Sequence, residues 1–349
     1  LAALQPNQVE SFTTAAIAAL TTSQLVSGIG VNVSGFSLAQ VAALTTTQAA
    51  ALTTAQTPYL DGTRTGGLTS ASAASLSTAY LAAMTPSQIS GFSTDAIAAL
   101  TTSQIVTGIG NDISGISTSQ VVALTTAQAS ALTNGQLSAL DSVQLGALET
   151  ADVQALSVSA ISGIGPDVAG LSTSQIVALT ASQAGALTTE QAVAMSTSQI
   201  NAFEPVDAQN LSTQFLRALS PSKVAALSTS TISALTAVQF GSGIGAGVSS
   251  LTTSQIAALI PLQASVLSTQ QAQLLDTAQI SALSAANAQV LPTAALSTFG
   301  TEQLAALSTA AVAALTTQQV VLGLGSDISG LDTSQISALS NTAVAALST

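Results

Sequence analysis

The side chains that could support chemistry are few, and the most regular set follows five glycine-containing segments. Each segment contains Gly-Ile-Gly or Gly-Leu-Gly, at 28–30, 108–110, 163–165, 243–245 and 323–325. Two residues after the second glycine, four of them carry an acid or an amide (Asn32, Asp112, Asp167 and Asp327), and the fifth carries Gly247. Glycine-rich aspartate loops bind Ca²⁺ in some secreted repeats. Because calcium needs about six to eight oxygen ligands and each segment offers one carboxylate at most, we interpret these residues as capping or turn residues.

Catalysis lacks its usual participants in this sequence. The chain contains no Cys, His or Trp, so the common ligands of zinc, haem and iron–sulfur clusters are missing, and no His can activate a serine. Other acids are scattered without a paired arrangement for acid–base work; they include Glu10, Asp95, Glu149, Asp152, Glu190, Glu204, Asp207 and Glu302. The sequence therefore predicts no catalytic, cofactor-binding or metal-binding residue, and we expect that the chain is not an enzyme.

Composition excludes several partners. Three basic residues stand against fifteen acidic ones, which gives a formal net charge of −12. Nucleic acids and anionic membrane surfaces attract clustered Lys and Arg, so neither is expected as a partner. Although 47% of the residues are hydrophobic, Thr and Ser interrupt every apolar run before it reaches the roughly 18 residues of a membrane span. We therefore expect an ordered chain without membrane insertion.

An eight-residue lattice organises the whole chain. Apolar residues recur at Leu4, Phe12 and Leu20 and continue to Leu156; the lattice then shifts by one residue and runs from Leu171 to Leu347. A typical octad is Leu251–Ala258, with the sequence Leu-Thr-Thr-Ser-Gln-Ile-Ala-Ala. We number the octad from its lattice residue, so Leu251 is position one and Gln255 is position five. Repetition at a short fixed period indicates a solenoid, in which each unit buries its apolar face on its neighbours.

Three signals predict that each octad is a short helix. Position two is usually Thr or Ser, which are good helix N-caps. Position five is most often Gln, and Ser/Thr-Xaa-Xaa-Gln is the capping box; Asp152 and Asp207 also occupy position five, where a carboxylate suits a helix N-terminus. Proline is favoured at the first helical position, and position three carries Pro6, Pro86, Pro205, Pro221 and Pro261.

Two other architectures compete with short helices. A continuous helix is excluded, because eight residues at about 100° each would carry the lattice leucines around the rod. A β-solenoid is the remaining alternative, since Thr, Val and Ile favour strands, although strict alternation is absent. The sequence thus predicts an all-α solenoid of short capped helices, one per octad.

Spacing of the glycine segments indicates how many octads make one coil. Each segment is about twice as long as an octad, and we count it as one long unit. Counted in this way from each first glycine to the next, every separation is a multiple of three units. We therefore expect about three units per coil, with five glycine loops on one side; two or six units also satisfy the counting. Residues 57–67 break the octad and are expected to form an exposed irregular loop.

Residues 1–349 are expected to form a single continuous array, as a segment of a longer repetitive protein. Runs such as Leu100–Ile105 and Leu251–Ile256 (Leu-Thr-Thr-Ser-Gln-Ile) resemble the tandem repeats of very large secreted bacterial surface proteins, which are adhesin-like or filament-forming. This resemblance implies an extracellular structural protein of a surface fibre, filament or biofilm matrix, with self-association end to end or side by side and contacts to the cell surface or other matrix components. The alternative is the stalk of a giant adhesin whose binding domain lies elsewhere.

Overall fold

The structure is a computed structural model that describes residues 1–347. Within that range every regular element is helical, with 33 α-helices of four to six residues, and no β-strand occurs. The prediction of an all-α solenoid is confirmed, and the alternative β-solenoid does not fit the described residues. The chain divides into two compact units, 1–178 and 179–349, and each is described by itself.

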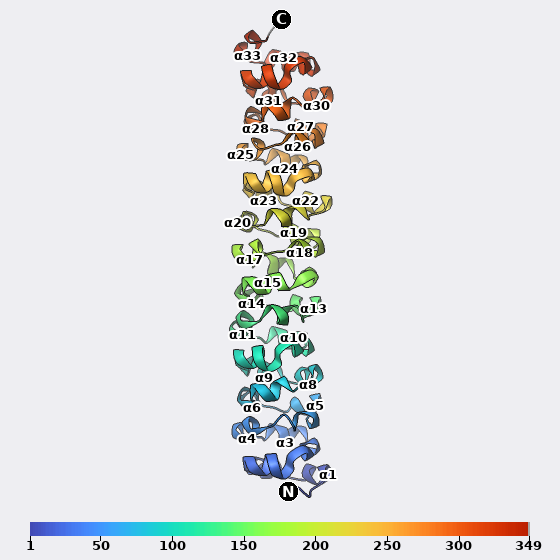
Figure 1. The fold of residues 1–349 in the computed structure, drawn as a ribbon, viewed down its shortest axis with the longest axis vertical. Helices are drawn as coiled ribbons and strands as arrows, with labels where there is room; N and C mark the ends of the chain where they lie inside the picture. Colours follow the sequence, from blue (N-terminus) through green and yellow to red (C-terminus); the bar gives the residue numbers. More distant parts are fainter. Residues whose placement is uncertain (348–349) are drawn as a thin grey trace. The chain divides into compact units, whose positions relative to one another are not determined.

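The helices follow one another at the octad spacing (Figure 1). The first unit contains α1 (Pro6–Glu10), α2 (Thr14–Ala18), η1 (Gln24–Ile29), η2 (Gly30–Gly35), α3 (Leu38–Ala42), α4 (Thr46–Ala51), η3 (Thr57–Tyr59), α5 (Gly62–Thr65), α6 (Ser70–Ser75), α7 (Thr78–Ala82), α8 (Pro86–Ser90), α9 (Thr94–Ala99), η4 (Gln104–Ile109), η5 (Gly110–Gly115), α10 (Thr118–Val122), α11 (Thr126–Ala131), α12 (Asn134–Leu137), α13 (Ser142–Gly146), α14 (Thr150–Ala155), α15 (Val158–Gly163), η6 (Gly165–Gly170) and α16 (Thr173–Val177).

The second unit contains α17 (Ala181–Gly185), α18 (Thr189–Ala194), α19 (Thr197–Asn201), α20 (Pro205–Ala208), α21 (Thr213–Arg217), α22 (Pro221–Ala226), α23 (Thr229–Ala234), η7 (Gln239–Ile244), η8 (Gly245–Ser250), α24 (Thr253–Ala257), α25 (Pro261–Ala264), α26 (Thr269–Leu274), α27 (Thr277–Ser281), α28 (Ala285–Val290), α29 (Thr293–Leu296), α30 (Thr301–Ala305), α31 (Thr309–Ala314), η9 (Gln319–Leu324), η10 (Gly325–Gly330), α32 (Thr333–Ala338) and α33 (Asn341–Ala345).

Each octad makes one helix and one corner. In α10, the N-cap residue Ser117 has extended backbone angles, and its hydroxyl accepts a hydrogen bond from the amide of Gln120. The preceding residue, Ile116, is extended as well, so two extended residues turn the chain before each new helix begins. All five prolines at position three stand at the start of a helix, as the sequence predicts.

Helices of successive coils stack in three columns within each unit. In the first unit α7 packs on η4, and α11 packs on α14. A second column contains α8, η5, α12 and α15, and a third contains α4, α6, α9, α10 and α13. The stacked helices α11 and α14 begin at Thr126 and Thr150, a separation of three octads. Three units per coil is therefore confirmed, and coils of two or six units are not formed.

Core side chains come mainly from positions one and six. In the octad that starts at Phe92, Phe92 is 3% exposed and Ile97 is completely buried. Burying a side chain of this size contributes about 1.5–3 kcal/mol relative to leaving it in water. Helices of five or six residues are unstable alone, so this burial between coils must stabilise them.

The five glycine segments differ from the expected loops, because they are helical. Four of them consist of a π-helix followed by a 3₁₀-helix, as in η4–η5. The third segment in chain order instead pairs the α-helix α15 with η6. The second glycine of each has a positive φ, between 50° and 63°, where the chain changes direction. Four segments fill the length of two octads and the α15–η6 segment is one residue shorter, so each covers two helices of the neighbouring coil, as η4 packs on α7 and η5 on α8. The count of one long unit per segment was therefore wrong, although it led to the correct coil.

The columns also wind around the axis of the unit. In Figure 1 the column of α4, α6, α9, α10 and α13 passes from the left edge of the first unit to its right edge. Each glycine segment begins in the column next to the one in which the previous segment began. The segment η4–η5 packs on α7 and α8, whereas α15–η6 packs on α12 and α13. The winding offsets this step, and Figure 1 draws the blue and teal segments of the first unit on one face.

Residues 57–67 do not form the exposed loop that the sequence predicts. They contain the short helices η3 and α5, and Thr57, Leu60 and Thr65 are each 1% exposed or less. The octad survives here because Leu60 and Leu68 keep the lattice spacing. Asp61 at position two still caps α5, because its side chain accepts a hydrogen bond from the amide of Arg64.

The second glycine of each segment should be needed because of its positive φ, and not because a larger side chain would clash. An added Cβ at Gly245 (φ 52°) would meet no atom within 4 Å, and at Gly241 it would make an ordinary contact with Val266 at 3.5 Å. We predict that Gly245→Ala destabilises its coil by about 1–3 kcal/mol, the cost of an unfavourable backbone region. Gly241→Ala should be neutral or mildly stabilising. Amide hydrogen exchange in η7 and η8 would measure both, and equal effects of the two substitutions would contradict the backbone explanation.

Candidate functional site

The glutamines at position five form the most repeated polar arrangement in the chain. Within its own octad, each glutamine accepts a hydrogen bond from the N-cap amide, and this bond completes a capping box where the N-cap is Ser, Thr or Asp. The Oε1 atom of Gln128 accepts a hydrogen bond of 2.8 Å from the amide of Thr125, and the Thr125 hydroxyl accepts one of 3.3 Å from the amide of Gln128. These two bonds satisfy amides at the helix N-terminus that have no partner inside the helix.

The other end of the same amide group reaches the coil below. The Nε2 atom of Gln128 donates to the carbonyls of Leu100 at 2.7 Å and Ile97 at 2.9 Å, which are 28 and 31 residues earlier. The same pair of offsets recurs at Gln40, Gln48, Gln88, Gln104, Gln120, Gln239, Gln255, Gln263, Gln279, Gln303, Gln319 and Gln335. We call this set of hydrogen bonds between coils the glutamine ladder.

The ladder solves a problem that very short helices create. The last four carbonyls of any α-helix have no partner inside it, and in a helix of five residues that is nearly all of them. An unsatisfied buried carbonyl costs about 1–3 kcal/mol. Because the glutamine amide supplies both an acceptor to its own helix and a donor to the helix end below, one side chain serves both termini.

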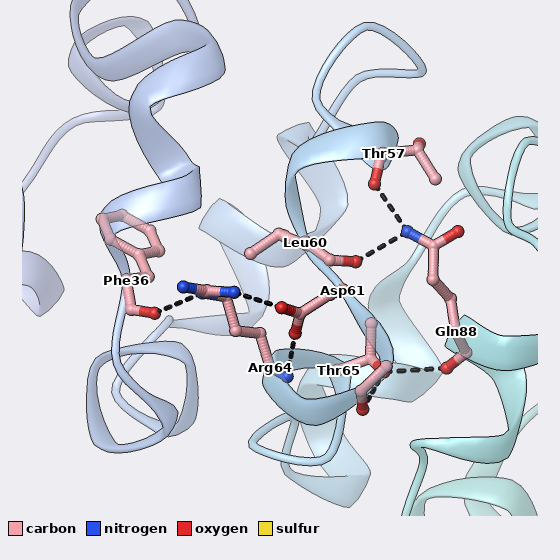
Figure 2. Close-up of polar contacts among 8 residues, drawn as sticks. Phe36, Thr57, Leu60, Asp61, Arg64, Thr65 and Gln88 are labelled. Atoms are coloured by element: carbon pink, nitrogen blue, oxygen red, sulfur yellow. Dashed lines mark hydrogen bonds and ion pairs between the residues drawn. The ribbon is translucent and has the colours of Figure 1, made fainter. Parts of the chain in front are cut away.

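Where position five is not glutamine, another donor often takes its place. Arg64 donates from Nε to the carbonyl of Phe36 at 2.8 Å, and it also forms an ion pair with Asp61 (Figure 2). Figure 2 shows Gln88 reaching the carbonyls of Thr57 and Leu60 in the same neighbourhood. Further donors to the carbonyl 28 residues earlier are Ser72, Thr231 and Asn287.

Lysine fills one rung of the ladder. The Lys223 ammonium donates to the carbonyls of Ala192 at 2.9 Å and Val193 at 2.6 Å. Partial burial of this group lowers the pKa of Lys223 from its usual value. A donor is what these rungs share, whether it is charged or neutral.

Two position-five residues, Asp152 and Asp207, are exceptions, because an ionised carboxylate cannot donate a hydrogen bond. Their residues are 1% and 2% exposed, and the Oδ2 atom of each is buried without a hydrogen-bond partner. Burial raises the pKa of Asp207 to about 6, with Glu204 adding to the effect, and burial likewise raises the pKa of Asp152. We expected a carboxylate favoured by the helix N-terminus. The hydrogen bonds from the N-cap amides do favour the charged form, but desolvation outweighs them.

Asn32, Asp112 and Asp167 lie in three separate glycine segments of the first unit, and Asp327 lies in a glycine segment of the second. The Asn32 side chain donates to the carbonyl of Leu4 at 2.9 Å, 28 residues earlier, so it is a further rung. The three aspartates lie in the first turns of η5, η6 and η10, where a negative charge is favourable. Among residues 1–347 no group of three or more acids, His or Cys lies close enough to hold a metal ion.

Two open grooves adjoin the fourth glycine segment in the second unit. Their volumes are about 400 and 430 Å³, and both are lined by Gly241 and Gly245. Gly241 leaves room there, because the other π-helices carry valine at this place, at Val26, Val106 and Val321. Neither lining contains an acid, so the grooves hold no group for acid–base chemistry.

Sequence reasoning found the capping role of glutamine and missed the ladder. The missed signal is the identity of the residue, because Glu serves a capping box as well as Gln does, yet no octad carries Glu at position five. Apart from apolar residues, Tyr80 and the two aspartates, this position holds only Gln, Asn, Ser, Thr, Lys or Arg. Every one of these six can donate a hydrogen bond, so the choice of polar residue indicates an acceptor beyond the octad.

Removing one rung should destabilise the joint between two coils. Gln128→Ala leaves the buried carbonyls of Ile97 and Leu100 and the amide of Thr125 without partners, so we predict a loss of about 2–4 kcal/mol in local stability. Gln128→Glu keeps the capping acceptor and should lose as much at neutral pH. Hydrogen exchange of α9 and α11 would measure both.

Gln273 provides the matched control, because it is exposed and lies outside position five. Gln273→Ala should change local stability by less than about 0.5 kcal/mol. The ladder would not be needed for stability if Gln128→Ala had an effect as small as that of the control.

None of the described helices has the length and apolar character that crossing a membrane requires.

Comparison with known proteins identifies the repeat in parts of the chain. The family model of the ALTTAQ repeat matches residues 73–107 and 166–197, and two separate matches agree with a tandem array. No curated protein matches the chain. The matched residues include α7–α9 in the first region and the position-five glutamines Gln175, Gln183 and Gln191 in the second. These portions of the chain are similar to that repeat family.

Proposed function

We propose that this chain is a structural, non-catalytic repeat protein that contributes length and regular spacing to an extracellular bacterial fibre, filament or matrix. The observation that carries the proposal is the glutamine ladder. Each coil satisfies the helix ends of the coil before it, so an array can be extended by adding octads without any new kind of contact. Proteins built this way are stabilised by nearest-neighbour terms and grow in one dimension.

The character of the outer surface supports self-association as the mode of assembly. Only 5% of the residues are charged, and the net charge of −12 is spread over 349 residues, so electrostatic repulsion at any one contact between copies is weak. Position four adds exposed apolar side chains in several octads of the second unit, with Val206, Val238 and Leu262 between 58% and 67% exposed. Weak repulsion and exposed apolar groups together favour lateral contacts between copies.

Absence of catalytic activity and an extracellular location are part of this proposal. The polar groups most regularly buried at position five are committed to joining coils, which leaves them no free capacity to bind a substrate. A sequence without Cys or His also lacks the usual nucleophile and base. The location rests on the resemblance to secreted bacterial repeats.

Electron microscopy of the purified full chain tests the proposal directly. We expect filaments or laterally associated bundles whose abundance increases with protein concentration, and light scattering should report the same increase. The triple variant Val206→Ser, Val238→Ser and Leu262→Ser should reduce lateral association while its circular dichroism stays unchanged, because Ser is the residue at position four of many octads.

The matched control places the same number of changes on polar residues of position four. Ser174→Thr, Ser198→Thr and Ser254→Thr keep the surface polar and should associate as the original chain does. A chain that stays monomeric at every concentration would contradict self-assembly and favour the alternative, the stalk of an adhesin.

A further inference from the structure

Two rungs of the glutamine ladder are occupied by groups that can donate a hydrogen bond only when protonated. Asp152 lies on α14, which packs on α11 below it, and Asp207 lies on α20, which packs on α17. Each side chain has one oxygen, Oδ2, that is buried without a partner. The exposed fractions of the two residues are only 1% and 2%.

The positions of the neighbouring carbonyls follow from the rest of the ladder. Short side chains at position five donate to the carbonyl 28 residues earlier, as the Thr231 hydroxyl does to Phe203 at 3.0 Å. The equivalent carbonyls are those of Leu124 for Asp152 and Leu179 for Asp207. A neutral carboxyl group has one O–H that can make this bond. A carboxylate has none, and it would place a charged oxygen against a carbonyl oxygen in a dry interface.

We propose that Asp152 and Asp207 are proton-controlled joints between coils, closed when the carboxyl group is protonated and donates to the coil below, and loosened when it is ionised. The other rungs stay closed at any pH near neutrality, because amides, hydroxyls, Lys and Arg remain donors there. The array would therefore respond to acidity at two defined places, one in each unit. This inference does not depend on the proposed function.

The charges around both joints act in one direction. On their own helices the nearest charged groups are the N-cap residues Glu149 and Glu204, whose negative charges oppose ionisation of Asp152 and Asp207. The elements packed against them, which are α11 and α16 for Asp152 and α17 and α23 for Asp207, contain no charged residue. No cation on these elements therefore compensates a carboxylate at either joint. The raised pKa values agree with this geometry, with that of Asp207 at about 6.

One neutral group distinguishes the two joints. The Thr126 side chain hydrogen-bonds to Asp152 and lowers its pKa, which partly offsets the effect of burial. Asp207 has no such side-chain partner among the groups that set its pKa. The response to pH should therefore be larger at Asp207, and this joint is the one to test first.

The sign of the pH dependence follows from proton linkage. The carboxyl group of Asp207 binds its proton more tightly in the closed joint than in an opened one, where the pKa is about 3.9. The stabilising contribution is therefore complete below about pH 4 and is lost as pH rises through about 6. A difference of roughly two pKa units corresponds to an approximately 100-fold change in the opening equilibrium.

Hydrogen exchange on the full chain tests the joint at Asp207. We expect protection factors of α17 and α20, corrected for the intrinsic exchange rate, to fall by roughly 30- to 100-fold between pH 4 and pH 7.5. In Asp207→Asn they should stay constant over this range and exceed those of the original chain at pH 7.5, since Asn donates at any pH, as Asn287 does. Asp152→Asn should act in the same direction on α11 and α14.

Asp327 supplies the matched control, because it stands two residues after Gly325 and is exposed. Asp327→Asn should leave the pH dependence at α17 and α20 unchanged. Constant protection of these helices in the original chain would overturn the proposal, and so would an unaltered pH dependence in Asp207→Asn. A carbon-13 titration of the Asp207 carboxyl group that reports a pKa near the ordinary value of about 3.9 would overturn it even if no variant folded.

Discussion

A single side-chain amide that bonds in two directions is the interaction on which this structure depends. Its oxygen completes the start of one helix, and its nitrogen completes the end of a helix in the coil below, as Gln120 does with Ser117 and Phe92. Helices of five or six residues expose almost all of their terminal amides and carbonyls, and they are too short to be stable alone. The ladder is the reason that such short pieces can be stacked at all.

This joint also sets the geometry of the coil. The glutamine reaches carbonyls 28 and 31 residues earlier, so each coil must close after three octads to place donor and acceptor together. The glycine segments keep close to this length: four of them fill two octads, and after the α15–η6 segment, which is one residue shorter, Gln175 donates to carbonyls 27 and 30 residues earlier. Their positive-φ glycines bend a longer helical segment around a corner that an extended Leu-Thr pair makes elsewhere. Variation in local structure is thus tolerated wherever the separation between coils is kept.

Basic and acidic residues at position five have opposite effects on the hydrogen bonds between coils. Arg64 and Lys223 replace glutamine with a stronger donor and satisfy the carbonyls below them. Asp152 and Asp207 replace it with an acceptor, and burial then favours the neutral acid. The difference follows from the acceptors, since the end of a helix presents carbonyl oxygens and carries partial negative charge. A buried cation suits that end, and a buried anion does not.

The sequence by itself determined the helices and their boundaries, whereas two, three or six units per coil stayed open until the contacts between coils decided for three. Position two fixed the caps, position three placed Pro86 and Pro261 at helix starts, and the apolar lattice fixed which residues are buried, because these are local or periodic properties. Only the tertiary structure decided that the glycine segments are helical, that residues 57–67 stay in the stack, and that Asp207 is buried with one oxygen lacking a donor. Each of these features depends on contacts with residues one coil away in the chain. The sequence of a single octad does not specify which atoms will pack against it.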